Sequence, residues 1–221
     1  MVTAKAAVDL AVKTADDRFG RLDVVVNNAG YGLFSMIEEV TEQQARDQFE
    51  PNVFGALWVT QAVLPYLREQ GSGHIVQVSS IGGLTAFPAL GVYNASKWAL
   101  EGMSQALAAE VAGFGIKVTI VEPAAYATDW GGSSAVHSEA LPAYQEVREG
   151  LAAYWSTLTP GDPRATAAAI LQVVDAEEPP LRFFLGAGLL DAMRAEHATR
   201  VAAWEEWNDA SEAATGSGSA A

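Results

Sequence analysis

The sequence predicts an α/β protein in which a parallel β-sheet is covered by helices on both faces. Three observations support this fold class. Short apolar runs rich in β-branched residues alternate with longer segments of helical spacing, as in strand–helix–strand units. Half of the 221 residues are hydrophobic and only 18% are charged, which is enough apolar surface for one sizeable core. Small and polar residues follow three of the strands, where such sheets bind ligands.

The strands are predicted from apolar runs that are rich in valine and isoleucine. They are residues 22–26, 74–79, 116–121 and 181–185. Pro123 follows the third run and ends it, because proline cannot donate to a sheet. Since helical segments separate the strands, we expect the strands to be parallel.

The helices are predicted from apolar positions at helical spacing. They are residues 3–19, a helix opening at Thr41, 53–68, 93–111, 164–176 and 189–207. Gly20 ends the first helix, and Gly71 ends the third. Thr41 and Gln44 match a capping box, which explains the start of the second helix.

The segment 124–160 has little regularity and is rich in aromatic residues, which is typical of a substrate lid. Its larger aromatic residues are Trp130, Tyr144, Tyr154 and Trp155. We expect residues 1–208 to form a single domain. Residues 209–221 are mostly small and are expected to form a flexible Ala/Gly/Ser tail.

Composition excludes several classes of partner and site. A formal charge of -14 argues against nucleic-acid backbones and anionic membranes, which both attract Lys and Arg. The absence of cysteine excludes disulfides and thiolate metal sites, and the three histidines lack metal-ligand spacing, so no metal site is expected. The sequence shows no targeting segment or membrane span. A cytoplasmic enzyme is therefore expected.

Ser80, Tyr93 and Lys97 form the candidate catalytic group. Tyr93 and Lys97 are four residues apart at the start of a predicted helix, so they share one face. An ammonium beside a phenol favours the phenolate, which predicts a Tyr93 pKa below its usual value of about 10. A tyrosine of this kind can transfer a proton while the Ser80 hydroxyl holds the reacting oxygen. Alternatively, Ser80 is a cap, Tyr93 a half-buried aromatic and Lys97 a solvated charge.

Several motifs in order resemble the short-chain dehydrogenase/reductase family. They are Asn27-Asn28-Ala29-Gly30, Asn52, Ser80, Tyr93-x-x-x-Lys97 and the segment from Pro123 to Thr128. A lone Tyr-x-x-x-Lys is a weak signal, whereas the joint occurrence is specific. The resemblance implies a three-layer, Rossmann-like α/β fold. It also implies an oxidoreductase that transfers hydride between NAD(P)(H) and an alcohol or carbonyl substrate.

The resemblance also implies a role for each matching residue. The implied catalytic residues are Asn52, Ser80, Tyr93 and Lys97. Tyr93 would be the general acid/base, Lys97 would tune it and bind the nicotinamide ribose, and Asn52 would help to hold a proton-relay water. The implied contacts with NAD or NADP are Asn28, Ala29, Gly30, Tyr93, Lys97, Pro123 and Thr128. Plain alternatives are turn residues at 27–28 and caps at Asn52 and Thr128.

The resemblance further implies a small-molecule substrate and a homodimer or homotetramer that associates through helices 53–68 and 93–111. Two departures stand against it. The chain has Pro123-Ala124-Ala125 where the family usually has Pro-Gly, so we expect a Cβ to crowd the backbone near the nicotinamide, or to cost strain if φ is positive. No glycine-rich pyrophosphate turn precedes Asn27, so we expect a chain truncated at its N-terminus, without the family's first strands. A non-catalytic remnant or pseudoenzyme that serves as a packing partner is the alternative.

Overall fold

The parallel sheet predicted from the sequence is present in the computed structural model, which describes residues 2–216. Its strands are β1 (Val24–Asn27), β3 (Gly73–Val78), β4 (Ile116–Pro123) and β6 (Arg182–Leu185). Their order in the sheet is β1-β3-β4-β6, and every neighbouring pair is parallel. All four predicted strands and their parallel arrangement are confirmed.

A second, smaller sheet was not predicted. It pairs β2 (Leu33–Phe34) with β5 (Val136–His137), again in parallel. These strands are only two residues long, so they carry no readable alternation of apolar and polar residues. Their pairing ties the irregular segment 124–160 to the chain just after β1.

Among the described residues, six helices occur close to their predicted positions, and two more lie in the segment 124–160 and at the start of the expected tail. They are α1 (Lys5–Phe19), α2 (Glu42–Phe49), α3 (Ala56–Gln70), α4 (Gly91–Val111), α5 (Gln145–Ser156), α6 (Thr166–Val174), α7 (Leu189–Glu206) and α8 (Asn208–Ala213). Gly20 and Gly71 end α1 and α3 with φ of 76° and 68°, a left-handed conformation that glycine adopts without strain. The capping box of Thr41 and Gln44 is present at the start of α2.

The start of α3 differs from the prediction. A helix is predicted over residues 53–68, but Glu50–Gly55 is a π-helical segment and the α-helix begins only at Ala56. Pro51 lies in this segment and has no N–H, so it removes one bond of the α-helical ladder. Such π-helical insertions are rare and frequently occur at functional sites.

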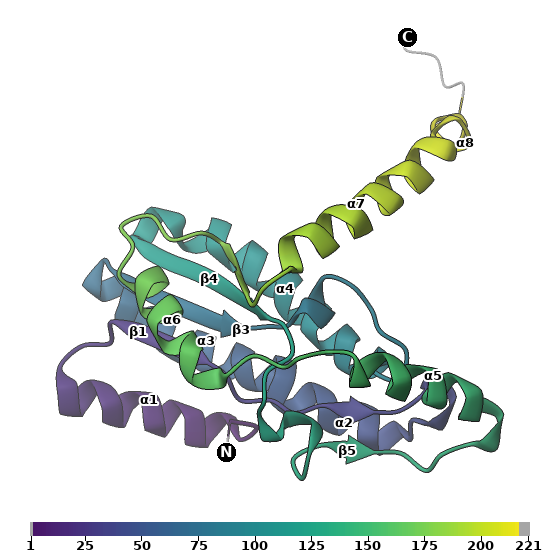
Figure 1. Cartoon of the computed structure of the whole chain (residues 1–221). Coiled ribbons are helices and arrows are strands. Elements are labelled where there is room, and N and C mark those ends of the chain that lie inside the picture. Colours follow the sequence, from purple (N-terminus) through teal and green to yellow (C-terminus); the bar gives the residue numbers. More distant parts are fainter. Residues whose placement is uncertain (1, 217–221) are drawn as a thin grey trace. The chain divides into compact units, whose positions relative to one another are not determined.

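Helices cover both faces of the main sheet (Figure 1). The β3 neighbours Ile75 and Val76 point to opposite faces, because successive strand residues alternate. Ile75 packs in a core with α3 and α4, and Val12 of α1 lies at its border. Val76 packs with Val121 and Leu185 in a second core that contacts α6. The three-layer, Rossmann-like arrangement is therefore confirmed.

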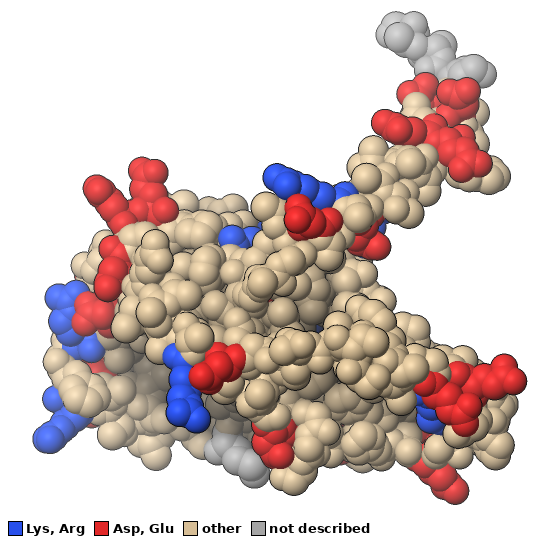
Figure 2. Space-filling view, in the orientation of Figure 1, with Lys and Arg blue, Asp and Glu red and all other residues tan. Residues whose placement is uncertain are grey.

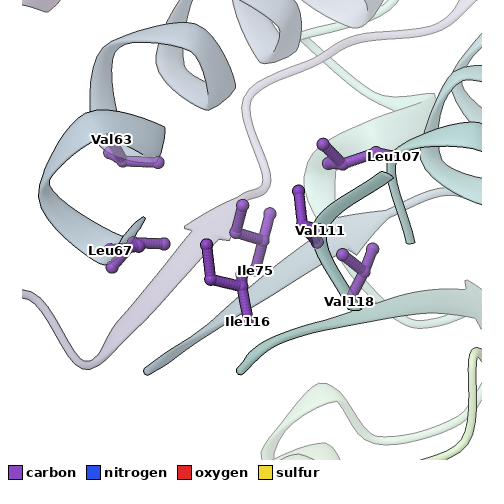
Figure 3. Close-up of a cluster of buried hydrophobic side chains, with 7 residues drawn as sticks. All are labelled: Val63, Leu67, Ile75, Leu107, Val111, Ile116 and Val118. Carbon is purple, nitrogen blue, oxygen red and sulfur yellow. The ribbon is translucent and has the colours of Figure 1, made fainter. Parts of the chain in front are cut away.

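The larger core fixes α3 and α4 against the sheet. Its buried members are Val63, Leu67, Ile75, Leu107, Val111, Ile116 and Val118 (Figure 3). Burying one such side chain contributes about 1.5–3 kcal/mol relative to leaving it exposed. This packing matters for function because α4 carries Tyr93 and Lys97.

The chain divides into two compact units, Met1–Gly186 and Ala187–Ala221. The first unit contains both sheets and α1 to α6, and the second contains α7 and α8. Residues 209–213 of the expected tail are helical, and residues 217–221 lie outside the described residues. A single domain over residues 1–208 stays a prediction.

The surface reflects the acidic composition of the chain. In Figure 2, basic side chains lie as small separate groups between acidic ones on the face shown. Among residues 2–216, no helix has the length and apolarity needed to cross a membrane. Within the same residues, no group of three or more His, Cys, Asp or Glu side chains could hold a metal ion.

Candidate active site

The candidate site lies where the strands of the main sheet end. Because the strands are parallel, the turns that follow β1, β3 and β4 all leave the same edge. The register places Asn27 opposite Gln77, and Val78 opposite Val121. The three stretches that the sequence places at strand ends therefore meet at one edge, as predicted.

Ser80 and Tyr93 approach each other across a turn of glycines. Ser80 precedes a short 3-10 helix, Ile81–Gly83, and its Oγ accepts a hydrogen bond from the Gly82 N–H at 3.0 Å. A Cβ on Gly82 would lie 3.3 Å from Cε1 of Tyr93 and 3.4 Å from Oγ of Ser80. It would also lie 2.7 Å from Oδ1 of Asn94, closer than real Cβ contacts allow. Glycine at position 82 thus permits the close approach. Ser80 caps the turn and contacts Tyr93 as well.

Tyr93 and Lys97 are both buried on α4, with 5% and 6% of their surface exposed. The Lys97 Nζ lies 5.9 Å from the centre of the Tyr93 ring. It donates a hydrogen bond of 2.9 Å to the carbonyl oxygen of Val78, the last residue of β3. The solvated-charge alternative for Lys97 is therefore wrong, because the ammonium is held against the end of the sheet.

Burial dominates the acidity of both side chains. It raises the pKa of Tyr93 to about 12, and a hydrogen bond with Ser80 works in the opposite direction. Burial also lowers the pKa of Lys97 to about 8, against the attraction of the Glu101 carboxylate. The prediction of a Tyr93 pKa below about 10 is wrong for this structure, because burial of the phenol raises the pKa more than the hydrogen bond with Ser80 lowers it.

Asn52 lies in the π-helical segment and is almost fully buried, with 1% of its surface exposed. Its Oδ1 accepts a hydrogen bond from the Tyr31 N–H, and its Nδ2 donates to the Tyr31 carbonyl oxygen, both at 3.2 Å. Nδ2 also donates to Oγ of Ser96 on α4 at 3.0 Å. Asn52 therefore fastens the turn after β1 to α4, rather than capping a helix as in the alternative.

The turn after β1 carries Asn28, Ala29 and Gly30, which are exposed. A Cβ on Gly30 would lie 2.8 Å from Oδ1 of Asn52, so the backbone passes against Asn52 with no room for a side chain. This close approach depends on glycine and gives the turn one fixed path.

The segment after β4 carries the remaining predicted contacts. Pro123 is the last residue of β4 and is partly buried. Thr128 is exposed, and its Oγ1 accepts a hydrogen bond of 3.4 Å from the Trp130 N–H, which is the capping role of the alternative. Among the described non-glycine residues only Ala89 has a positive φ, so the predicted backbone strain at Ala124 is wrong.

An aromatic wall stands beside Tyr93. Here "aromatic wall" means Phe34, Trp130, His137 and Trp155. The Trp130 ring centre lies 5.0 Å from those of both Tyr93 and Phe34. Phe34 also stacks on His137 at 5.2 Å and meets Trp155 edge-on at 6.0 Å. The sequence indicated Trp130 and Trp155, whereas Phe34 and His137 were missed because β2 and β5 were not predicted.

Polar contacts hold the segment 136–156 over this region. Arg148 of α5 forms an ion pair with Glu39, and it donates a hydrogen bond to the carbonyl oxygen of Leu141 at 2.9 Å. The Leu141 N–H donates to the same Glu39 carboxylate at 2.8 Å. The Tyr144 hydroxyl donates to Glu38. The expected lid is thus anchored to the residues that follow β2.

Comparisons with known proteins agree with this geometry. Residues 1–138 match the family described as short chain dehydrogenase. The oxidoreductase BOA17 of Botryotinia fuckeliana is 39% identical over 216 residues, covering 95% of this chain and 78% of that protein.

Solved structures show the same likeness. A short-chain dehydrogenase from Streptomyces avermitilis is 42% identical with a TM-score of 0.89, over 97% of this chain and 78% of that chain. A short chain dehydrogenase from Burkholderia cenocepacia in complex with NADP shares the fold, with a TM-score of 0.71 at 24% identity over 93% of this chain and 75% of that chain. The ordered motifs, the fold and these relatives together show that the chain belongs to the short-chain dehydrogenase/reductase family of oxidoreductases.

Proposed function

We propose that the chain interconverts an alcohol and a carbonyl compound with a nicotinamide cofactor, and that Tyr93 is the general acid/base. The observation that carries this proposal is the buried group at the sheet edge. The Tyr93 phenol contacts Ser80, and Lys97 lies on the same helix face, anchored to the end of β3. Few other reactions need this combination of a hydroxyl, a phenol and an ammonium.

The proposed roles follow from the protonation state and the contacts of each side chain. Ser80 donates a hydrogen bond to the substrate oxygen and so fixes it beside the phenol. With a pKa raised to about 12, Tyr93 carries its proton at neutral pH. It therefore acts as a donor to a carbonyl oxygen, which suits the direction of reduction. In oxidation, the positive charge of Lys97 favours the phenolate that accepts the proton.

The residues at the sheet edge fit a dinucleotide. Bound NADH or NADPH supplies the hydride for the carbonyl carbon. Lys97 has three N–H donors, and the recorded hydrogen bond to Val78 uses one of them, so it retains capacity to bind a ribose hydroxyl. The exposed backbone at Gly30, pressed against Asn52, allows close approach of the adenosine side. The other proposed contacts are Asn28, Ala29, Pro123 and Thr128, and the choice between NAD and NADP stays open.

The aromatic wall supports an apolar or ring-bearing small molecule as the substrate. Trp130 packs on Tyr93 and Phe34, so a substrate whose oxygen reaches Tyr93 lies against apolar ring surface. Aromatic faces of this kind favour flat or apolar partners over strongly hydrated ones. A homodimer or homotetramer that works in the cytoplasm is part of the same proposal.

Cofactor titration tests the proposal directly. The purified chain is titrated with NADH and with NADPH, and cofactor fluorescence reports binding. We expect saturable binding of at least one of them below millimolar concentration. Lys97→Met should weaken that binding about tenfold or more, because a charge-assisted hydrogen bond is lost. Lys13→Met, on the exposed side of α1, should leave it unchanged.

Failure to bind either cofactor at millimolar concentration would contradict the enzyme proposal for this chain. That outcome would favour the non-catalytic alternative, a packing partner.

A further inference from the structure

A cluster of charged side chains, in which two buried carboxyl groups share one partly exposed arginine, lies behind Lys97 and has no part in the roles proposed above. Its members are Glu101 on α4, Glu122 on β4 and Arg182 on β6. Glu101 is 5% exposed and Glu122 is fully buried. The Arg182 Nε lies 3.1 Å from Oε2 of Glu101 and 3.4 Å from Oε1 of Glu122. The cluster thus joins three elements through one guanidinium.

Glu101 connects this cluster to Lys97. The two residues are four positions apart on α4 and both are buried, so they occupy the same face of the helix. The Lys97 Nζ also donates a hydrogen bond to the Val78 carbonyl oxygen. Ser79, the next residue, approaches Glu101, since both side chains lie within 3.0 Å of the position of a Cβ on Gly83. Glu101 is therefore confined between the end of β3 and Arg182.

The two carboxyl groups of the cluster are not equivalent. Glu101 faces two cations, Lys97 and Arg182, whereas Glu122 faces Arg182 and the Glu101 carboxylate. Burial, together with the charge of Glu101, raises the pKa of Glu122 to about 8. Of two carboxyl groups that share one arginine, the one with more cations around it ionises first. Burial raises the pKa of Glu101 as well, but Arg182 and Lys97 oppose that rise, so Glu101 is the carboxyl group of the pair that ionises first, and Glu122 keeps its proton to higher pH.

We propose that Glu101 is a positioning residue for Lys97: its buried carboxylate keeps the lysine ammonium charged and in place, and Arg182 holds that carboxylate. The inference rests on the function proposed above, because it is the charge of Lys97 that serves Tyr93 and the cofactor. Arg182 extends the arrangement to β6, so the lysine is supported from three elements of the fold.

A purely structural role predicts something different. If the cluster only joined α4 to the sheet, any side chain of similar volume would serve, and apolar replacements of buried ion pairs are often neutral or stabilising. A positioning role instead requires negative charge at position 101. The two explanations therefore differ in the pKa of Lys97, which is lowered by burial and raised by Glu101. The titratable groups next to Lys97 are Tyr93 and Glu101 on α4, and Glu122 on β4 and Arg182 on β6 lie next to Glu101.

Lysine NMR measures this pKa without cofactor or substrate. The chain has four lysines, Lys5, Lys13, Lys97 and Lys117, so lysine labelled with carbon-13 at Cε gives few signals. The Lys97→Arg variant identifies the Lys97 signal. Its pKa is then compared in wild type, Glu101→Gln, Glu101→Asp and Glu110→Gln. Glu110 is exposed on the same helix and provides the matched control.

We expect Glu101→Gln to lower the Lys97 pKa by about one unit or more, since an uncompensated buried ammonium releases its proton more readily. Glu101→Asp, which keeps the charge, should restore most of the wild-type value and would still give an answer if Glu101→Gln folded poorly. Glu110→Gln should leave the pKa unchanged. An unchanged Lys97 pKa in Glu101→Gln, or equal shifts in Glu101→Asp and Glu101→Gln, would overturn the proposal.

This experiment is independent of catalysis. If the wild-type chain bound no nicotinamide cofactor, the proposed function would fail while the Lys97 titration still reported on Glu101. If cofactor bound and the Lys97 pKa did not respond, the positioning role alone would fail. In a chain that turns over, Glu101→Gln should also move the alkaline limb of the pH–rate profile to lower pH, because Lys97 would lose its charge earlier.

Discussion

At the scale of single residues, the site depends on how closely Ser80 and Tyr93 approach each other. Gly82 lies between them, in contact distance of both side chains and of Asn94. The turn that holds this pair therefore has no room for a Cβ at position 82. A methyl group at position 82 would disturb the geometry of Ser80 and Tyr93 more than it would disturb the rest of the fold.

Replacing Gly82 by alanine tests that dependence. The added Cβ would meet Asn94 Oδ1 at 2.7 Å, so side chains must shift. We expect a loss of about 1–3 kcal/mol in the free energy of unfolding and at least a tenfold loss of turnover. Urea unfolding and steady-state kinetics measure the two effects.

Gly102→Ala is the matched control, because nothing lies within 4 Å of its Cβ position on α4. It should be neutral or stabilise the helix by up to about 1 kcal/mol. Equal activity in Gly82→Ala and Gly102→Ala would contradict the account of the Ser80–Tyr93 approach.

The sequence identified Tyr93 and Lys97 as candidate catalytic residues, whereas it did not predict the Tyr93 pKa correctly. The spacing of Tyr93 and Lys97 predicts a shared helix face, and the structure has it. The spacing also predicts a lowered phenol pKa, and here the structure disagrees. Desolvation depends on what packs around a side chain from distant parts of the chain. The packing of Trp130 on Tyr93 becomes visible only in the folded molecule.

At the scale of elements, the local signals were reliable and the long-range pairings were not. The capping box at Thr41 and the glycine at position 71 mark helix ends through contacts a few residues apart. By contrast, β2 and β5 are two-residue strands separated by about a hundred residues, and nothing in their sequence announces the pairing. The π-helical turn at Glu50–Gly55 was hidden for a related reason: Pro51 signals an interruption but not its form.

The anchoring of α5 makes an element-scale prediction. Arg148 pairs with Glu39 and holds the pKa of that carboxyl below its usual range. Arg148→Gln should free the segment 136–156, so amide hydrogen exchange there should accelerate by roughly tenfold while the main sheet is unaffected.

Arg46→Gln provides the comparison, since its ion pair with Glu42 is exposed on α2. Exposed pairs of this kind contribute little, so exchange in α5 should stay at the wild-type rate. Unchanged exchange in Arg148→Gln would show that the segment is held by the aromatic wall and strand pairing alone.

A second prediction at this scale concerns Glu122 of β4, which lies beside Arg182 of β6. Its pKa is raised from 4.5 to about 8, so its protonated form stabilises the fold at low pH, and this stabilisation is lost as the pH rises through about 8. Glu122→Gln removes this dependence. The difference in the free energy of unfolding, Glu122→Gln minus wild type, should therefore increase by about 1–3 kcal/mol from pH 5 to pH 8, because only the wild type loses stability over this range.

Urea unfolding at several pH values measures the difference, with Glu110→Gln as an exposed control that should track wild type. A constant difference across this range would mean that Glu122 does not hold a proton in the folded chain.

At the scale of the whole molecule, exposed aromatic side chains suggest how copies of the chain associate. Trp98 on α4 is 43% exposed and Phe54, which stacks on Trp58, is 39% exposed. Aromatic residues are enriched in subunit interfaces, and the family resemblance implies association through these helices. We predict a dimer or tetramer by light scattering, with Trp98→Glu weakening association at least about tenfold.

Trp204→Glu is the control for that measurement, because Trp204 is 65% exposed on α7, outside the predicted interface. A monomeric wild type, or an equal effect of Trp98→Glu and Trp204→Glu, would contradict the predicted interface.

The family and its reaction class were predictable because several motifs occur together in the family's order along the chain. The stretches that carry Asn28, Ser80 and Thr128 are far apart in sequence, yet parallel strands bring them to one edge. The cluster around Arg182 was not predictable, because its link to Glu101 spans 81 residues and no motif marks it. Patterns along the chain thus reveal shared chemistry, and packing reveals how this chain supports it.

The central claim is that Tyr93 transfers the proton in a nicotinamide-dependent reaction, and one measurement tests it most directly. Oxidation of NADH and NADPH is followed by absorbance with a panel of ring-bearing ketones, in wild type, Tyr93→Phe and Tyr154→Phe. Tyr154 is an exposed tyrosine of α5 and serves as the control. We predict that Tyr93→Phe loses at least about a hundredfold in kcat while still binding cofactor, and that Tyr154→Phe stays near wild type. Turnover by Tyr93→Phe within a few-fold of wild type would contradict the account.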